Sequence, residues 1–123
     1  MSQQINDFFI EDVKNLIPEP IEINFSNSEV PKNYFTKVKD EIFYETKKIR
    51  SEIELNNNIL LPGVRFRDDS FLKTEAIVLI VLGIRTSARL VNNEIEFKET
   101  AIKYVKHAYS EYWSTLCKTP ATP

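Results

Sequence analysis

Residues 76–84, AIVLIVLGI, are the most apolar stretch of the 123-residue chain and decide its fold class. As a helix they would span about 13 Å, far short of the roughly 30 Å of a bilayer core, so the stretch does not cross a membrane. Most of its side chains are β-branched, which favours a buried strand. Taken alone, this stretch is compatible with either a helix or a strand.

The flanking residues favour the helix. Asp68-Asp69-Ser70 supplies side chains that cap a helix N-terminus, residues 85–91 continue a helical pattern, and Asn92-Asn93 suits the end of a helix. We therefore predict a helix over residues 70–92, placed at the centre of the fold or at an oligomer interface. The alternative is an α+β fold in which residues 76–84 form a buried strand.

Residues 32–55 show helical spacing more clearly. Pro31 suits the first turn of a helix, and Asn56-Asn57-Asn58 is a natural stop. The helix would be about 36 Å long, and its near-heptad spacing suggests an antiparallel partner or a dimer seam. Its apolar positions are Phe35, Val38, Ile42, Ile49 and Ile53.

Residues 94–117 form the clearest helix, with one broad apolar face, and residues 118–123 are expected to be a disordered tail. The face consists of Ala101, Ile102, Val105, Tyr109, Tyr112, Trp113 and Leu116.

The N-terminal part of the chain is more irregular. Residues 5–17 have the spacing of a short amphipathic helix. In residues 18–31, between prolines, apolar and polar residues alternate, which indicates one short strand or an extended strap whose nearby partner would be residues 58–66. The whole pattern predicts a mainly α fold: one helical domain over residues 1–117, built as a bundle of about four helices with this strap.

Composition narrows the function. The net charge is −2, but residues 1–30 carry six acidic residues and one lysine, a net charge of −5, so the rest of the chain carries +3. Only two glycines occur, which favours few turns and long helices. A single cysteine and a single histidine exclude an internal disulfide and predict no metal and no cofactor. We expect an intracellular, cytoplasmic protein because the N-terminus has no signal-peptide pattern.

The residue bias toward isoleucine, lysine, asparagine and aromatic residues is typical of AT-rich coding, as in many viruses, mobile elements and some prokaryotes. It suggests a viral or mobile-element protein.

The stretch GVRFRDD, residues 63–69, is the best candidate for an anion site. In an extended chain Arg65 and Arg67 share one face, about 7 Å apart, and could hold a phosphate or carboxylate. On the predicted helix that follows, Arg85 and Arg89 share a face at i and i+4. The other interpretation is structural: these arginines pair with Asp68, with Asp69 or with the acids of the N-terminal segment.

Catalytic motifs are weak. Ser70 and Lys73 match a serine–x–x–lysine pattern, but the enzymes that use it need further motifs and a larger fold. His107 is expected to pair with Glu111 one helical turn away, and no nucleophile is tied to it. We therefore predict that the protein is not an enzyme.

The leading hypothesis is a non-enzymatic interaction protein, an adaptor, inhibitor or small subunit, which self-associates and binds a protein partner rather than a membrane. Partner contacts are expected at Phe66, Tyr109, Tyr112 and Trp113, since aromatic residues are enriched at interfaces. Two alternatives stay open. One is a nucleic-acid-binding subunit that uses the paired arginines, and the other is a small enzyme with an arginine-lined anion pocket.

Overall fold

The computed structural model describes residues 20–72 and 75–118, with side chains up to Trp113. The predicted helix over residues 5–17 and almost all of the predicted tail lie outside these residues. The elements follow one another as β1 (Ile21–Ser26), α2 (Glu29–Asn57), β2 (Arg65–Asp69), β3 (Ala76–Val81), β4 (Ile84–Leu90) and α3 (Glu94–Lys118).

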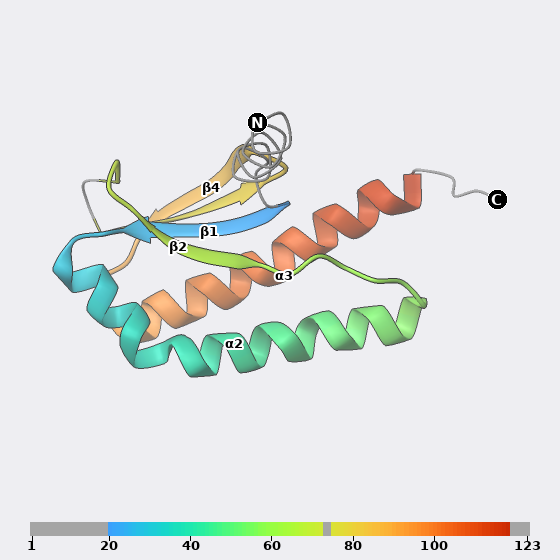
Figure 1. Ribbon diagram of the computed structural model, residues 1–123, viewed down its shortest axis with the longest axis horizontal. Coiled ribbons are helices and arrows are strands. Elements are labelled where there is room, and N and C mark those ends of the chain that lie inside the picture. The colour runs from blue at the N-terminus through green and yellow to red at the C-terminus, as the bar shows by residue number, and fades with distance from the viewer. Residues whose placement is uncertain (1–19, 73–74, 119–123) are drawn as a thin grey trace, which may run out of the picture.

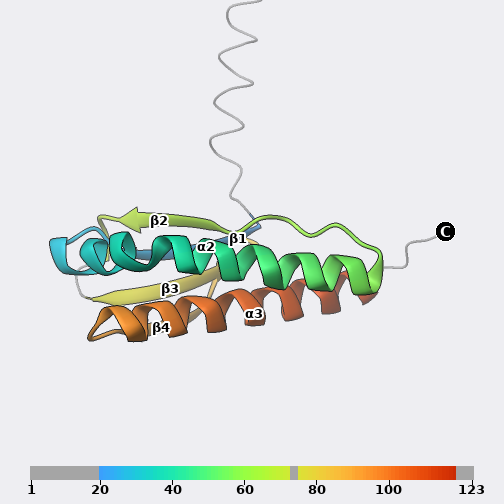
Figure 2. The same ribbon diagram turned by 90° about the horizontal axis from the view of Figure 1, so that it is seen from below.

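The strands form one mixed sheet in the order β2-β1-β3-β4. β1 runs parallel to β2 and antiparallel to β3, and β3 and β4 form an antiparallel hairpin. Figure 1 shows the two long helices on one side of the sheet. In the view of Figure 2, α2 lies beside β2 and α3 lies toward β4, so each helix accompanies one edge of the sheet.

β1 is the centre of the structure. All six of its residues are buried. Ile21, Ile23 and Phe25 join the core against the helices, so by the alternation of a strand Glu22 and Asn24 point to the opposite face. The residues around Ile21 were predicted to be a strand or strap; they are a strand, but a central one that pairs on both sides.

The predicted bundle of four helices is wrong. The described part of the chain holds two helices and a four-stranded sheet, an α+β fold. The predicted helix over residues 70–92 is instead the β3–β4 hairpin, because its β-branched residues pair with β1 and fill the core. The α+β alternative described this region better, although the strand ends at Val81 and not at residue 84.

The turn of the hairpin explains the error. Leu82 and Gly83 both have positive φ, at 52° and 80°, which is the geometry of a two-residue turn that matches the twist of the strands. The Leu82 N–H donates to the Pro20 carbonyl at 2.7 Å and ties the turn to the start of β1. Gly83 was therefore a turn signal inside an apolar run and not a residue of a helix.

The two helices were predicted well. α2 extends the predicted 32–55 by a few residues at each end, and Asn58 closes it in a left-handed conformation with φ of 53°. α3 matches the predicted 94–117 closely. Asn93, expected to end a helix, instead begins α3, because its side chain accepts a hydrogen bond from the Glu96 N–H at 2.9 Å.

The segments that suggested self-association are used inside the chain. Ile77, Val78 and Leu79 of β3 are at most 1% exposed, so they are not available to a second copy. On α2, Val38 and Ile42 are buried in the same core. The near-heptad spacing thus reflects packing of α2 within one chain.

Candidate protein-binding groove

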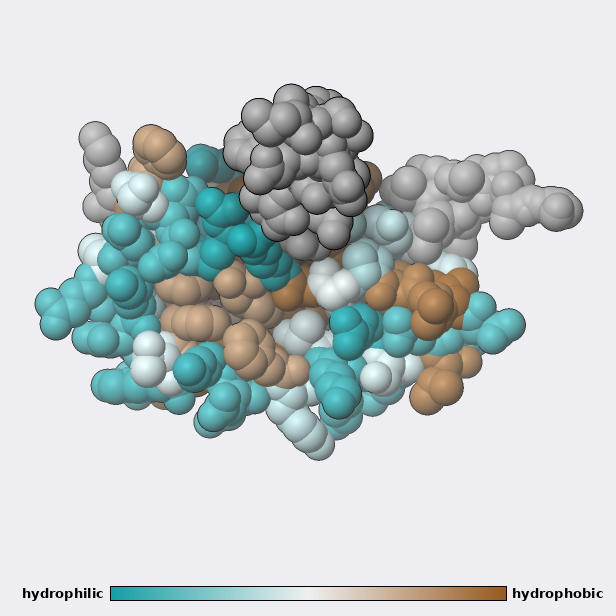
Figure 3. Space-filling model, in the orientation of Figure 1, coloured by the Kyte–Doolittle hydropathy of each residue, from teal (hydrophilic) through white to brown (hydrophobic). Residues whose placement is uncertain are grey.

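A groove runs between α2 and β2, the strand at one edge of the sheet. It consists of two hollows of about 320 and 190 Å³ that share Phe66. The first lies toward the start of α2, between Lys32 and Arg67, and the second toward its end, between Lys47 and Gly63. Figure 3 shows an apolar patch in this region with hydrophilic side chains around it. We call this feature the α2–β2 groove.

Three phenylalanines form the floor of the groove. The ring centroids of Phe35, Phe43 and Phe66 lie 5.6 to 6.0 Å from one another, so each ring contacts the other two. Phe25 of β1 lies 4.7 Å from Phe35 and joins the triad to the core. Phe43 remains 46% exposed, so the aromatic surface continues from the core to the solvent.

Local structure explains why these rings meet. Phe66 pairs with Ile23 in the sheet register, so its side chain points to the face that the helices cover. Phe35 and Phe43 are eight residues apart on α2 and lie on the same side of the helix, as their ring contact shows. A strand and a helix thus each contribute aromatic side chains to one surface.

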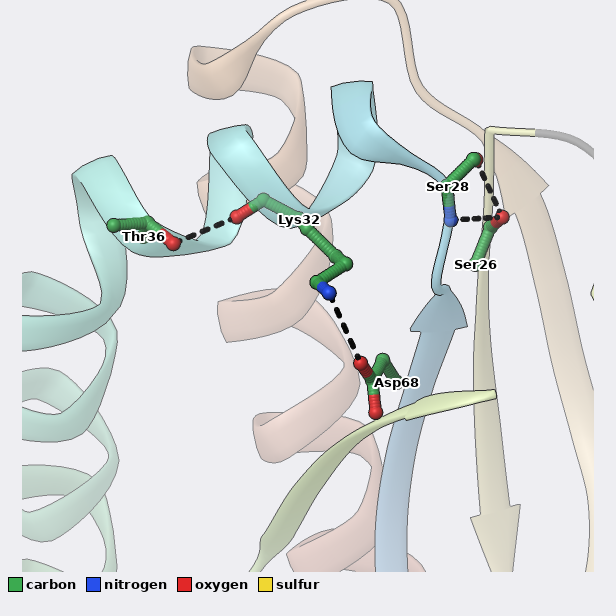
Figure 4. Close-up of polar contacts among 5 residues, drawn as sticks. All are labelled: Ser26, Ser28, Lys32, Thr36 and Asp68. Atoms are coloured by element: carbon green, nitrogen blue, oxygen red, sulfur yellow. Dashed lines mark hydrogen bonds and ion pairs between the residues drawn. The ribbon is translucent and has the colours of Figure 1, made fainter. Parts of the chain in front are cut away.

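Ion pairs border the first hollow. Lys32 Nζ of α2 lies 3.8 Å from Asp68 Oδ2 of β2, and Figure 4 shows this contact bridging the two elements. Arg67 Nη1 lies 3.6 Å from Glu22 Oε1, on the face of the sheet away from the helices. Because these charges neutralise one another in pairs, this end of the groove is close to electrically neutral.

The second hollow has a different electrostatic character. Lys47 and Arg50 lie one turn apart on α2, and neither forms a salt bridge with any residue that the structure describes. Thr46 also lines this hollow, and its hydroxyl oxygen is buried with no hydrogen-bond partner among the described residues. This end of the groove therefore carries net positive charge beside exposed aromatic surface.

The loop that leads into β2 is held rigidly over the end of α2. The Tyr109 hydroxyl of α3 donates to the Pro62 carbonyl at 3.0 Å, and Glu54 Oε2 accepts from the Leu61 N–H at 2.8 Å. Burial raises the pKa of Tyr109, while the nearby Arg50 guanidinium opposes the shift. A fixed loop keeps the second hollow in shape.

The four candidate arginines do not form one cluster. Arg65 and Arg67 share one face of β2, as the extended geometry predicted. Arg85 and Arg89 lie on β4, the opposite edge of the sheet. Arg85 pairs with Ile80 and Arg89 with Ile77, so the two point to opposite faces of the strand. The predicted shared helical face of Arg85 and Arg89 is therefore wrong.

Arg67 supports the structural interpretation of GVRFRDD. It pairs with Glu22, one of the acids of the N-terminal thirty residues. Glu22 is 7% exposed, and its Oε1 has no closer hydrogen-bond donor among the described residues. Arg67 is thus the counter-ion of a buried carboxylate, whereas Arg65 remains exposed at the edge.

The aromatic candidates lie in different places. Tyr109 is completely buried, so it supports the fold and cannot contact a partner. Tyr112 and Trp113 are partly buried on α3, and Phe66 lies in the groove. Phe43 was not predicted as an interface residue. It could have been found as an aromatic residue on α2 that lies outside the near-heptad apolar positions of that helix.

The remaining candidates, His107 and Ser70, lie on different elements. His107 Nε2 lies 3.5 Å from Glu111 Oε1, which confirms the predicted helical pair. Ser70 lies in the turn after β2 and not at a helix start. Within residues 20–72 and 75–118, no group of three or more histidine, cysteine or acidic residues could hold a metal ion. No helix in the same ranges is both long and apolar enough to cross a membrane.

No protein-family model matches the chain, and no curated protein does. Among solved structures, the MxiA protein of Shigella flexneri is similar at 19% identity and a TM-score of 0.37, over 59% of this chain and 21% of MxiA. A cytoplasmic domain of Salmonella InvA is similar at 24% identity and a TM-score of 0.39, over 61% of this chain and 41% of that domain. Both are bacterial proteins, and neither supports the viral or mobile-element origin that the residue bias suggested. The chain spans less than half the length of either structure.

Proposed function

We propose that the protein is a non-enzymatic protein-binding domain, an adaptor, inhibitor or small subunit, that holds a segment of its partner in the α2–β2 groove. One observation carries the proposal: the triad of Phe35, Phe43 and Phe66 continues from the core to the solvent along two hollows. Half-exposed aromatic rings in a concave surface are the usual anchors of protein interfaces.

The dimensions of the groove limit what it can hold. From Lys32 to Arg50 the helix α2 rises about 27 Å at 1.5 Å per residue. This length fits about eight residues of extended chain, or a helix of four to five turns. The phenylalanine floor would bind apolar or aromatic side chains of the partner segment. Lys47 and Arg50 would favour acidic residues at one end of that segment.

The two alternatives fit the geometry less well. A nucleic-acid surface would draw on Arg65, Arg67, Arg85 and Arg89, but these lie at two opposite edges of the sheet. An enzyme with an arginine-lined pocket needs several arginines in one cavity, whereas the hollow beside Arg67 holds one arginine and three phenylalanines. His107, the candidate base, lies on the exposed side of α3.

The test is affinity capture with matched variants. Partners are captured from a native lysate, with and without nuclease treatment, by the tagged wild type and by its Phe43→Asp and Phe71→Asp variants. Both variants place a carboxylate on an exposed phenylalanine, but Phe71 is 89% exposed and lies outside the groove. We expect a stoichiometric protein to bind the wild type and Phe71→Asp and to be lost with Phe43→Asp.

Two outcomes would overturn the proposal. Equal capture by all three proteins would exclude the groove as the binding surface. Loss of every captured protein after nuclease treatment would show that capture depends on nucleic acid, and would favour the nucleic-acid-binding alternative. Circular dichroism of Phe43→Asp shows whether a loss of binding reflects unfolding.

A further inference from the structure

We infer that the α2–β2 groove has an occupant within the same chain: the acidic, phenylalanine-containing residues 5–17. This inference deepens the proposed function, because it names an intramolecular competitor for the surface that the partner would use. It rests on where the segment joins the fold, on its sequence and on the charge of the second hollow.

The segment joins the fold beside the groove. β1 begins at Ile21, and the sheet register places Glu22 next to Arg65 and Ile23 next to Phe66. Neighbouring strands lie about 4.8 Å apart, so residue 21 is one strand away from the groove wall. Residues 18–20 add about 10 Å of extended chain, which is enough to pass the β2 edge.

The sequence of the segment complements the groove. Its apolar residues recur at helical spacing and include Phe8 and Phe9, which suit an aromatic floor. Residues 5–17 contain three acidic residues, Asp7, Glu11 and Asp12, and one lysine, so the segment carries a net charge of −2. The positive charges without a described salt-bridge partner, Lys47 and Arg50, line the hollow nearest to its point of attachment.

The lengths also agree. Thirteen residues of helix measure about 20 Å, and the groove follows α2 for about 27 Å. A tethered segment of this kind has an effective concentration in the millimolar range, so even a weak contact fills the groove. A partner must then displace residues 5–17, and its apparent affinity falls by the fraction of molecules in which the groove is free.

Paramagnetic relaxation tests this inference directly. In a Cys117→Ser background, Ser2→Cys carries a nitroxide, and amide signals of the isotope-labelled full chain are measured. We expect strong broadening at Phe43, Thr46 and Val64 of the groove region and little at Ala88 on β4, the far edge of the sheet.

A matched pair of variants tests the charge complementarity. Lys47→Glu lies in the groove and Lys103→Glu on the exposed side of α3. Reversing one exposed charge next to an acidic segment weakens docking modestly, so the relaxation enhancement at groove amides should roughly halve with Lys47→Glu and stay unchanged with Lys103→Glu.

A mixed sample separates one chain from two. Isotope-labelled protein without nitroxide is combined with nitroxide-labelled protein without isotopes. Broadening of groove amides in this sample would mean that a second copy supplies the segment, which contradicts the inference. Absence of groove broadening in the doubly labelled chain would contradict it as well.

The results also separate this inference from the proposed function. If the groove amides show no broadening but Phe43→Asp still loses the captured partner, the inference fails and the proposed function stands. If the segment docks but capture does not depend on Phe43, the proposed function fails alone.

Discussion

The two edges of the sheet differ in what they present to a partner. At the β2 edge, α2 and the strand enclose a groove with a phenylalanine floor. The ions beside its first hollow are paired within the chain, whereas Lys47 and Arg50 beside the second form no salt bridge with a described residue. At the β4 edge, residues Ile84–Leu90 are nearly all exposed and contain Arg85 and Arg89. One edge presents an aromatic groove, and the other presents exposed positive charge.

The arginines of β4 oppose pairing of two copies. An antiparallel pair of β4 strands would bring Arg85 and Arg89 of both copies to one interface, and these like charges repel one another. The comparison teaches that edge exposure alone does not identify a binding site, since the distribution of charge and aromatic rings separates the two edges.

The largest effect is expected at Gly83, near the β4 edge, with Gly63, near the β2 edge, as its control. Gly83 has a φ of 80° in the β3–β4 turn, so Gly83→Ala should lower the free energy of unfolding by about 1 to 2 kcal/mol. Gly63 is the control, because a Cβ there meets only the mobile Arg50 guanidinium at 3.2 Å, and Gly63→Ala should cost less than about 0.5 kcal/mol. Denaturant unfolding measures both, and equal losses would contradict the assigned turn.

A smaller effect is expected at the loop that shapes the β2 edge. Tyr109→Phe removes the hydrogen bond to the Pro62 carbonyl and should cost about 1 kcal/mol at neutral pH. Burial raises the pKa of Tyr109 above 10.0, so its phenol binds a proton more tightly in the folded chain. The stability that this provides is complete below pH 10 and is lost as the pH rises through the folded-state pKa.

Unfolding measured between pH 8 and pH 11 therefore checks the role of Tyr109. The wild type should lose stability above pH 10 more steeply than Tyr109→Phe. Parallel pH profiles would show that Tyr109 does not contribute to the alkaline loss.

The smallest effect is expected at the β4 edge. Arg85→Glu removes a positive charge from this edge and adds a negative one, which should favour pairing of two copies by about 0.2 to 1 kcal/mol. Sedimentation velocity at high concentration should show more self-association for Arg85→Glu than for the wild type, with Arg85→Ala in between. Identical profiles for all three proteins would show that Arg85 does not oppose self-association through β4.

The local sequence pattern was enough to predict the two helices and part of the candidate site. α2 and α3 are long and strongly periodic, and their observed boundaries lie within a few residues of the predicted ones. Arg65 and Arg67 share a face because alternation is a property of any extended chain. The hairpin at residues 76–90 was predicted as a helix because a short apolar run is compatible with a helix or a strand. The choice depends on the segment it packs against, which the run itself does not show.

What the sequence determined by itself is therefore local: the two helices, the extended character of β1 and β2, and the absence of a recognisable catalytic motif. Only the tertiary structure decided which strand is central, because β1 becomes buried through pairing with two segments that are more than 35 residues away in the chain. The α2–β2 groove has the same origin. Phe35 and Phe43 come from α2 and Phe66 comes from β2, so their shared surface exists only after helix and strand pack together.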